Sequence, residues 1–445
     1  MKKQLRILSI LLILCLMAVA LVACDLQTEE PEHVHVDYVS QLKLDMTSNT
    51  YKIENPTIKN HVDGDTVHFN VSRDIVQTGV LKARFLAINT PESTGKIEAY
   101  GYKASRFTKE ALKNAESIII ESDDSKLNVD STGDRYLVWI WYKPAGATEY
   151  RNLNVEILQN GLAIASNTSE NRYGETAMKA LEQARAEKLN VHSGEKDPEM
   201  YYGNAIPLTM KELCLNVEEY ENKKVAFEGV IVRDHNSSVY IEEYDEETGL
   251  YFGMTVYYGH LSGRGLRILG VGNRVRIVGT LQYYETGGKW QVTGLSYDGR
   301  NPDDPDNIKL ISEGNAAANT LVDPDLFAEG KVSIEFETEE GVETVEYDYT
   351  QITLYTSISM NNLEIVDIYT TNNGGSSDGA MTFTCQTASG KTIDVRTEVL
   401  TDENGDLVTA DRYEGKTINV VGIVDIFSGE YQIRVFAVED ITIVE

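Results

Sequence analysis

Apolar and polar residues alternate over short runs along most of the chain, which is the pattern of β-strands with one buried face. In the first third these runs are "TVHFNVS", "LKARFLAIN", "SIIIES" and "RYLVWIWYK", separated by turn-forming residues. Between them, "EAYGYKASRFTKEALKNAES" places Ala104, Phe107, Ala111 and Leu112 at helical spacing, and two more helical stretches follow before residue 195. The pattern predicts a small β-barrel that carries helices.

The rest of the chain contains an internal echo. "GNRVRIVGTLQYYETGGKWQV" at 272–292 matches "GKTINVVGIVDIFSGEYQI" at 415–433, so Gly272 and Gly279 correspond to Gly415 and Gly422. Repeated sequence of this kind indicates similar β units in tandem. About five strands are expected in the middle of the chain, which resembles an OB-fold, a small Greek-key barrel that often binds single-stranded nucleic acid. We predict a mainly β, multidomain chain: an OB-type five-stranded barrel with helices, followed by two OB-like β-barrels.

The chain is too long for one hydrophobic core, because single domains rarely exceed about 250 residues and this chain has 445. Polar and Pro-rich stretches such as "DGRNPDDPDN" favour domain boundaries. The predicted division is a signal peptide at 1–23, an acidic tether at 24–50, a first domain at 51–197, a second at 204–300, a linker at 301–328 and a third domain at 329–445.

The N-terminal segment has the character of a secretory signal. Three cationic residues in the first six precede an apolar run from 7 to 22. A membrane-spanning anchor is the alternative, but the run is shorter than the roughly 20 residues that a span needs. "LVAC" at 21–24 resembles the lipobox of bacterial lipoproteins, in which the cysteine is lipidated. We therefore expect attachment through Cys24 to the cell membrane, with the protein on its extracellular face.

Charge is distributed unevenly along the chain. The formal net charge of −30 argues against general attraction of the whole surface to a polyanion. Lys and Arg nevertheless cluster around 82–113, whereas the part beyond about residue 330 is strongly acidic. Any chemistry on nucleic acid is therefore expected in the first domain.

Two stretches of the first domain carry candidate chemistry. "HVDGDTVHF" at 61–69 and "ARFLAINTPES" at 83–93 place carboxylates, an amide, an arginine and a glutamate at strand ends and turns: Asp63, Asp65, Arg84, Asn89, Thr90 and Glu92. Hydrolysis of a phosphodiester needs a hard cation with oxygen ligands, a cationic side chain for the phosphate and a base for water. Taken singly, each residue is explained as well by an ion pair or a turn.

Four segments in order make the pattern specific. "DGDTV" at 63–67, "RFLAINTPE" at 84–92, "YGYKASRFTKEAL" at 100–112 and "EKLNVHS" at 187–193 resemble the staphylococcal nuclease-like, or thermonuclease, family. The resemblance implies a nuclease for DNA and RNA with little sequence preference. It also implies a divalent cation, Ca²⁺ or another, bound by Asp65, Asn89 and the carbonyl of Thr90, with Asp63 as a further candidate ligand.

The resemblance implies catalytic roles for three residues. Arg84 matches the arginine that grips the phosphate, and Glu92 matches the general base or water-orienting acid. The family's second arginine follows a D-x-x-G-R turn, so "DSTGDRYLVW" at 130–139 makes Arg135 the candidate, displaced by the extra Asp134. Asn89 stands where the family has a carboxylate, which removes one negative charge from the cation site.

The second domain offers aromatic and cationic residues close together, Tyr257, Tyr258, Arg264 and Arg267, which could bind a single strand. An ordinary barrel with core tyrosines and solvated arginines explains them as well. The expected partners are DNA and RNA substrates and the membrane, with no obligate protein partner. The alternative function is a catalytically inactive surface lipoprotein that binds nucleic acid or protein.

Overall fold

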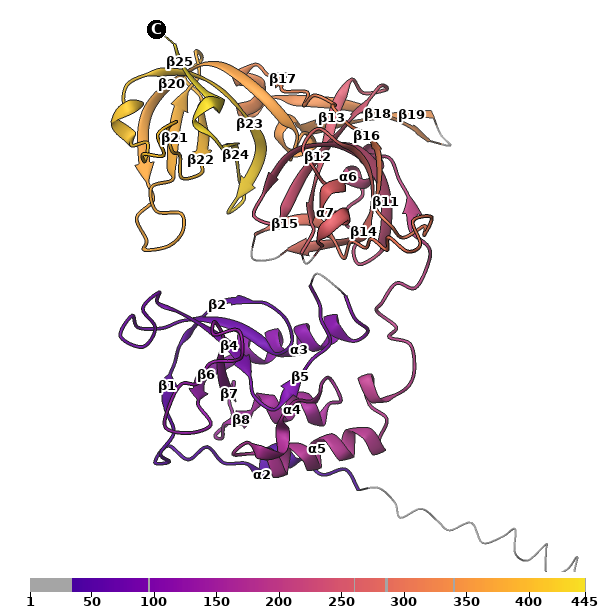
Figure 1. Cartoon of the computed structure of the whole chain (residues 1–445), viewed down its shortest axis with the longest axis vertical. Helices are drawn as coiled ribbons and strands as arrows, with labels where there is room; N and C mark the ends of the chain where they lie inside the picture. Colours follow the sequence, from indigo (N-terminus) through magenta and orange to yellow (C-terminus); the bar gives the residue numbers. More distant parts are fainter. Residues whose placement is uncertain (1–33, 95–96, 260, 285–286, 339–340, 445) are drawn as a thin grey trace, which may run out of the picture.

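The computed structural model describes residues 34–94, 97–259, 261–284, 287–338 and 341–444. The predicted signal peptide and Cys24 lie outside these residues. Figure 1 shows a first domain on one side of the molecule and two β-barrels packed beside each other on the other side. Within the described ranges, no helix has both the length and the apolar character that crossing a bilayer requires.

The first domain is built on a sheet with the strand order β1-β6-β7-β4-β3-β2. Strands β1 and β2 follow each other with only Asn55 and Pro56 between them, so the two ends of this sheet are joined through the chain. The pairing of β4 with β7 is parallel, and the neighbouring pairings are antiparallel. The strands are β1 (Lys52–Glu54), β2 (Thr57–His61), β3 (Thr66–Asn70), β4 (Val80–Phe85), β6 (Ala115–Glu121) and β7 (Tyr136–Pro144), with β8 (Arg151–Asn152) beside β7 and a separate pair of β5 (Ile88–Asn89) and β9 (Ile164–Ala165).

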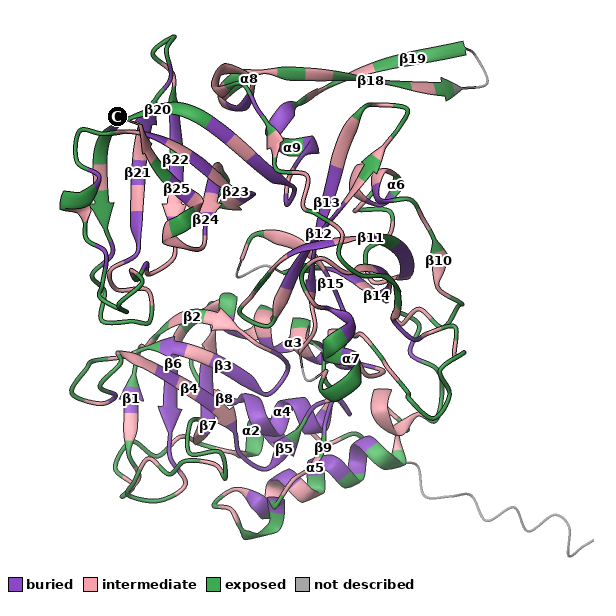
Figure 2. Cartoon of the chain, turned by 45° about the horizontal axis from the view of Figure 1, so that its top comes forward, coloured by how far each residue is buried: buried purple, intermediate pink, exposed green. Residues whose placement is uncertain are grey.

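Four helices cover this sheet: α2 (Tyr38–Gln41), α3 (Gly101–Lys113), α4 (Leu153–Gln159) and α5 (Gly174–Ala186). In α3 the buried residues Ala104, Thr108 and Leu112 recur every fourth position, which is the spacing of one helical face. All of α4 is buried, as the colouring of Figure 2 shows, so it is the helix at the centre of the core. The predicted barrel with helices is therefore confirmed.

The folded part of the chain begins before the predicted boundary at residue 51. The main-chain N–H of Val36 donates to Oε1 of Gln183 at 2.8 Å, and that of Tyr38 donates to Oε1 of Gln159 at the same distance. These bonds hold α2 against α4 and α5. Val39 is also fully buried, and Leu42 and Leu44 pack against the core of the first domain, so apolar contacts add to these hydrogen bonds.

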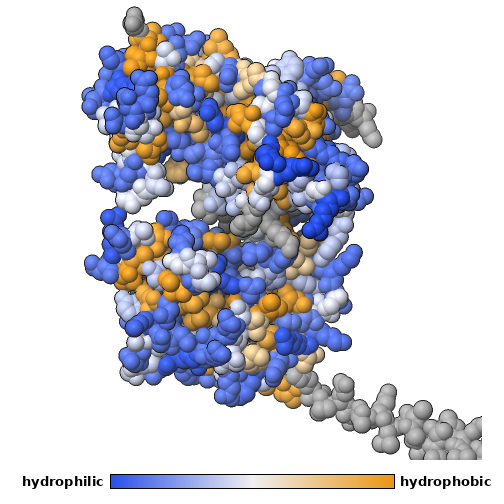
Figure 3. Space-filling view, in the orientation of Figure 1, coloured by the Kyte–Doolittle hydropathy of each residue, from blue (hydrophilic) through white to orange (hydrophobic). Residues whose placement is uncertain are grey.

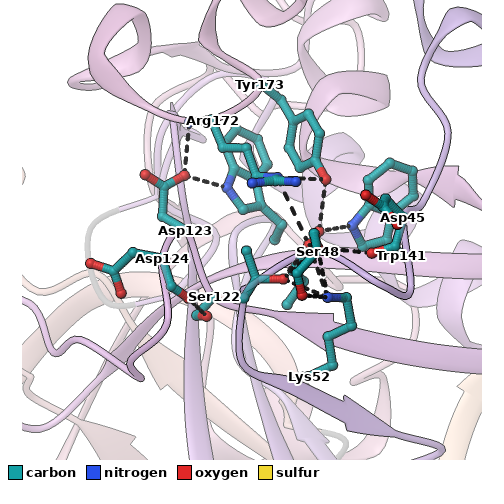
Figure 4. A network of polar contacts seen from close by, with 12 residues as sticks. Asp45, Ser48, Lys52, Ser122, Asp123, Asp124, Trp141, Arg172 and Tyr173 are labelled. Carbon is teal, nitrogen blue, oxygen red and sulfur yellow. Dashed lines mark hydrogen bonds and ion pairs between the residues drawn. The ribbon is translucent and has the colours of Figure 1, made fainter.

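A buried carboxylate fixes the next part of this segment (Figure 4). The Glu121 side chain is fully buried and accepts hydrogen bonds from Thr50 Oγ1 at 2.7 Å, Trp141 Nε1 at 2.8 Å and the Tyr173 hydroxyl at 2.9 Å. Lys52 Nζ lies 3.8 Å from the same carboxylate. The network joins the chain before β1 to β6, β7 and the start of α5.

The second domain is a closed five-strand barrel, here called the second barrel. Its strands follow the order β11-β12-β13-β15-β14, and β14 pairs again with β11 to close the ring. The pairing of β13 with β15 is parallel. The strands are β11 (Lys224–His235), β12 (Ser238–Asp245), β13 (Leu250–Tyr257), β14 (Arg274–Tyr284) and β15 (Lys289–Thr293), with α6 (Met210–Leu215), α7 (Gly263–Ile268) and the edge strands β10 (Ile206–Pro207) and β16 (Lys309–Ser312). Strand β16 lies within the segment predicted as linker.

The third domain, here called the third barrel, repeats the same closed order, β20-β21-β22-β24-β23 and back to β20. Its strands are β20 (Ser357–Thr370), β21 (Met381–Gln386), β22 (Thr392–Thr397), β23 (Thr417–Phe427) and β24 (Glu430–Val435), with β17 (Thr320–Leu321) and β25 (Ile441–Val444) at the edges. The fold class predicted from the sequence, mainly β with two barrels after the first domain, is confirmed.

The sequence echo has a physical cause in these barrels. A Cβ atom on Gly279 would lie 2.6 Å from the carbonyl oxygen of Thr293, and one on Gly422 would lie 2.6 Å from that of Arg434. Gly279 lies on β14, where β15 passes too close for a side chain, and Gly422 lies on β23, where β24 does the same. The echo therefore marks equivalent positions of β14 and β23.

The two barrels share a buried interface. Glu242 of β12 accepts hydrogen bonds from the N–H groups of Ser357 at 2.7 Å and Ala318 at 2.8 Å. The hairpin of β18 (Lys331–Thr338) and β19 (Gly341–Asp348) lies between α8 (Pro324–Glu329) and α9 (Tyr349–Ile352), and its Ile334 belongs to the hydrophobic core of the second barrel. The chain leading into the third barrel therefore completes the packing of the second.

The third barrel also reaches the first domain. Arg73 donates from Nη2 to the carbonyl oxygen of Asn373 at 3.0 Å. Figure 3 shows a gap elsewhere between the first domain and the barrels on this face. The first domain thus contacts both of the barrels that follow it.

Candidate active site

The register of β3 and β4 places the first two candidate residues together. Thr66 pairs with Arg84 across these antiparallel strands, so Asp65, which directly precedes β3, lies beside the end of β4. The N–H of Phe85 donates to the carbonyl oxygen of Asp65 at 2.8 Å and fixes this crossing. The Arg84 guanidinium forms an ion pair with the Asp65 carboxylate, and the arginine side chain is 14% exposed.

The turn after β4 returns to the same carboxylate. The N–H of Thr90 donates to Asp65 Oδ2 at 2.8 Å, and Arg84 donates from Nη2 to Asn89 Oδ1 at 2.7 Å. Asp65 is buried, whereas Asn89 is exposed. The structure therefore brings together Asp65, Arg84, Asn89 and Thr90, as the sequence pattern predicts.

Asp63 lies behind this group. It is buried, and its Oδ1 accepts a hydrogen bond from the N–H of Asp65 at 3.0 Å. Burial, and then the negative charge of Asp65, raise the pKa of Asp63 to about 7 from an ordinary value of 3.8. Near neutral pH this carboxyl group is therefore divided between its protonated and ionised forms.

Glu92 lies in an exposed position of the loop that leads to α3. Its carbonyl oxygen accepts a hydrogen bond from the N–H of Glu98 at 2.9 Å, and a Cβ atom on Gly101 would lie 2.2 Å from that oxygen. Partial burial, and then the charges of Asp65 and Glu98, raise the pKa of Glu92, while Arg84 and Arg135 lower it. Both predicted arginines therefore act electrostatically on this carboxylate.

Arg135 comes directly before β7 and beside β4, because Ala83 pairs with Tyr136. Its Nε and Nη2 lie 2.7 and 2.6 Å from Oδ2 of Asp130, and its side chain is 38% exposed. The inserted Asp134 forms an ion pair with Lys82 at 2.6 Å. The insertion is thus accommodated in the turn, and Asp130 binds one edge of the Arg135 guanidinium. No sequence pattern predicts this contact.

The donor set around Asp65 suits a hard divalent cation. Asp63, Asp65, Asn89 and the Thr90 main chain offer oxygen atoms only, which is the chemistry that Ca²⁺ prefers. Among the described residues, no group of three or more His, Cys, Asp or Glu side chains is arranged to hold a metal ion.

The aromatic and cationic residues predicted in the second barrel lie at the end of β13 and on α7. Tyr257 is half-buried, and the Tyr258 hydroxyl donates to Asp234 Oδ1 at 3.0 Å. Arg264 and Arg267 are exposed on α7. One of the two tyrosine hydroxyls is therefore engaged within the barrel, while both arginines face solvent.

A contact that the sequence analysis missed joins the second barrel to the Glu92 loop. Gln282 of β14 donates from Nε2 to the carbonyl oxygen of Ser93 and to the hydroxyl of Tyr102. A single glutamine at a strand end carries no pattern, so its partner in another domain could not have been recognised.

Comparison with known proteins identifies the region that contains this site. Residues 82–193 match the family described as "Staphylococcal nuclease homologue", a segment that includes Arg84, Asn89, Thr90, Glu92 and Arg135. A protein of Methanocaldococcus jannaschii that is described as uncharacterized is 31% identical over 121 residues. That alignment covers 23% of this chain and 54% of the relative, so the match spans about half of the relative's length. The chain therefore contains a staphylococcal nuclease-like domain.

Proposed function

We propose that the chain is a divalent-cation-dependent nuclease that hydrolyses phosphodiester bonds of DNA or RNA with little sequence specificity. One observation carries the proposal: Arg84 pairs with both Asp65 and Asn89, and its charge acts on Glu92. Arg84, Asn89 and Glu92 lie in the segment that matches the nuclease family. A cation-binding carboxylate, a guanidinium and a carboxylate of raised pKa are the groups that this hydrolysis requires.

In the proposed reaction the arginines bind the phosphate. A guanidinium donates two parallel hydrogen bonds to phosphate oxygens and stays charged at any working pH. The charges of Arg84 and Arg135 both lower the pKa of Glu92, so both charges would also act on a phosphate that binds beside that carboxylate. Their charges stabilise the negative charge that develops on the phosphate oxygens.

Glu92 is the proposed general base. Its raised pKa makes the carboxylate a stronger base toward the attacking water. Its exposed position leaves room for that water. A Ca²⁺ ion bound by Asp65, Asn89 and Thr90, with Asp63 nearby, would supply a positive charge for one phosphate oxygen.

We further propose that the enzyme is anchored to the membrane through lipidated Cys24 and acts on the extracellular face. The support is the sequence "LVAC" at 21–24 after an apolar run. In this location the weak cation affinity expected from Asn89 would suffice, because extracellular calcium modules work with dissociation constants of about 10⁻⁴ to 10⁻³ M.

The test is hydrolysis of single-stranded DNA, duplex DNA and RNA by the chain from residue 25 onward, with millimolar calcium or with a chelator. We expect cleavage that requires the cation and falls about 10² to 10⁴-fold in Glu92→Gln. Glu110→Gln, an exposed change on α3, is the matched control and should cleave normally. Absence of cleavage with calcium, magnesium and manganese would refute the proposal.

A second candidate function is a catalytically inactive lipoprotein that binds nucleic acid. The observation in its favour is the pairing of Arg84 with Asp65 and Asn89, which occupies the guanidinium and leaves the site one carboxylate short of the family pattern. Binding of single-stranded DNA without cleavage, unaffected by Glu92→Gln, would favour this alternative.

A further inference from the structure

The second barrel contacts the loop that carries Glu92 through one buried amide. Gln282 is 9% exposed and donates from Nε2 to the Ser93 carbonyl oxygen at 3.2 Å and to the Tyr102 hydroxyl at 2.6 Å. Ser93 is also buried, at 4% exposure. The contact therefore lies inside the interface between the two domains, away from solvent.

These two partners belong to the two segments that meet at Glu92. Ser93 directly follows Glu92, and Tyr102 is in the first turn of α3, next to Gly101, which packs against the carbonyl oxygen of Glu92. The Gln282 side chain thus binds both the residue that follows Glu92 and the first turn of α3, which packs against the Glu92 loop. A buried carbonyl oxygen that loses its donor is left unsatisfied, so this bond favours one loop conformation.

The position of Gln282 is repeated in the third barrel. Gln282 stands three residues after Gly279, and Asp425 stands three residues after the equivalent Gly422. Asp425 Oδ2 accepts a hydrogen bond from Arg434 Nη1 at 3.2 Å, and the same nitrogen donates to the Tyr240 hydroxyl of the second barrel at 3.1 Å. In both barrels this position of the fourth strand therefore lies at the contact with the preceding domain.

We propose that Gln282 is a positioning residue for Glu92, so that the second barrel is a structural part of the active site and not an appended module. The inference rests on the proposed nuclease function for its catalytic consequence. Gln282 touches no reacting atom; it fixes the loop from which Glu92 reaches the water. Its loss should lower the rate of the chemical step more than the affinity for substrate.

The experiment compares Gln282→Ala with the unchanged protein in two measurements, steady-state cleavage of single-stranded DNA and amide hydrogen exchange of the peptide around residues 88–102. We expect kcat to fall about tenfold or more with KM changed less than about threefold. Exchange in the Glu92 loop should become faster, while the midpoint of thermal unfolding stays close to that of the unchanged protein.

Two further variants separate positioning from packing. Tyr102→Phe removes one partner and leaves the Ser93 bond, so kcat should fall less than in Gln282→Ala. Gln291→Ala changes the half-buried glutamine paired with Gln282 across β14 and β15, and it should leave kcat unchanged. An equal loss in Gln291→Ala would indicate general damage to the barrel and overturn the proposal.

The two measurements also distinguish failure of this inference from failure of the proposed function. If the unchanged protein cleaves and Gln282→Ala has normal kcat, the positioning role is wrong while the nuclease function stands. If the unchanged protein cleaves nothing, the nuclease function fails. The hydrogen-exchange data then decide whether Gln282 positions the Glu92 loop. Unchanged exchange at 88–102 would then refute positioning of the loop, and faster exchange would support it without catalysis.

Discussion

Arg84 Nη2 lies 2.7 Å from Oδ1 of Asn89, so the amide that replaces a family carboxylate is fixed by the arginine proposed to bind phosphate. The same guanidinium pairs with Asp65. The proposed cation site and the proposed phosphate site would therefore share one arrangement of charges, and a change at Asn89 should affect both.

Asn89→Asp should tighten calcium binding. The substitution adds one negative charge beside Asp65, and calcium affinity increases with the number of carboxylate ligands. We expect the dissociation constant for Ca²⁺ to fall at least about tenfold, measured by calorimetric titration of the metal-free protein. Asn70→Asp, at the exposed end of β3, adds the same charge away from the site and should leave the constant unchanged. Equal affinities in Asn89→Asp and the unchanged protein would contradict the proposed ligand set.

The pH dependence of cleavage should report Glu92. A general base works when ionised, so kcat/KM should fall as the pH drops through the pKa of Glu92, at a pH above its ordinary value of 4.5. Because the charge of Arg135 lowers this pKa, Arg135→Ala should move the acidic limb to higher pH as well as lower the rate. A limb that remains in place in Arg135→Ala would show that another group controls the profile.

Asp63→Asn should stabilise the metal-free protein at alkaline pH. Asp63 has a higher pKa in the folded chain, about 7, than its ordinary 3.8, so the folded state binds the proton more tightly than the unfolded state. The free energy of unfolding therefore decreases as the pH rises from about 4 to 7, by up to roughly 4 kcal/mol. Asparagine keeps an oxygen to accept the Asp65 N–H and removes this penalty.

Urea unfolding with a chelator at pH 4 and at pH 8 measures the effect of Asp63→Asn. The buried Trp139 and Trp141 give a fluorescence signal from the first domain. The gain in stability should be large at pH 8 and small at pH 4. A gain of the same size at both values would mean that ionisation of Asp63 is not its cause.

Glu121→Ala should destabilise the first domain by about 3 to 5 kcal/mol. The change leaves Trp141 Nε1 and the Tyr173 hydroxyl without their acceptor and Lys52 without its nearby carboxylate, all in a buried site. Glu116→Ala removes an exposed carboxylate of the same strand, paired with Lys143 at 2.9 Å, and should lower the stability much less, because water screens this ion pair. Similar losses of urea resistance in both variants would refute the importance of the network.

Hydrophobic patterning predicted the barrels because burial follows the period of a strand. Val67 and Phe69 of "TVHFNVS" are buried and alternate with polar neighbours, and the echoed glycines mark where two strands approach closely in each later barrel. The approach of Asp65 to Arg84 was also predictable, because the two residues lie on short motifs at neighbouring strands and the register of β3 and β4 brings them together.

Polar contacts between distant segments were not predictable from the sequence. Asp130 binds Arg135, and Gln282 binds Ser93 of another domain. The fold brings these residues together, and their spacing in the sequence does not indicate it. The attachment of Val36 to Gln183 was missed for the same reason. The acidic residues of 25–37 made the whole segment 24–50 resemble a free spacer, although Val39 is fully buried in the core of the first domain.

The contact of Arg73 with Asn373 means that each of the three folded units contacts both of the others, as in a closed ring. In such a ring, the other two contacts hold the two surfaces of each contact at a high effective concentration. Loss of a single joint then loosens the geometry beside it without releasing the units from one another. The second barrel would consequently stay within reach of the Glu92 loop even when its own hydrogen bond is broken, and the molecule would respond to such a change by local misalignment rather than by coming apart.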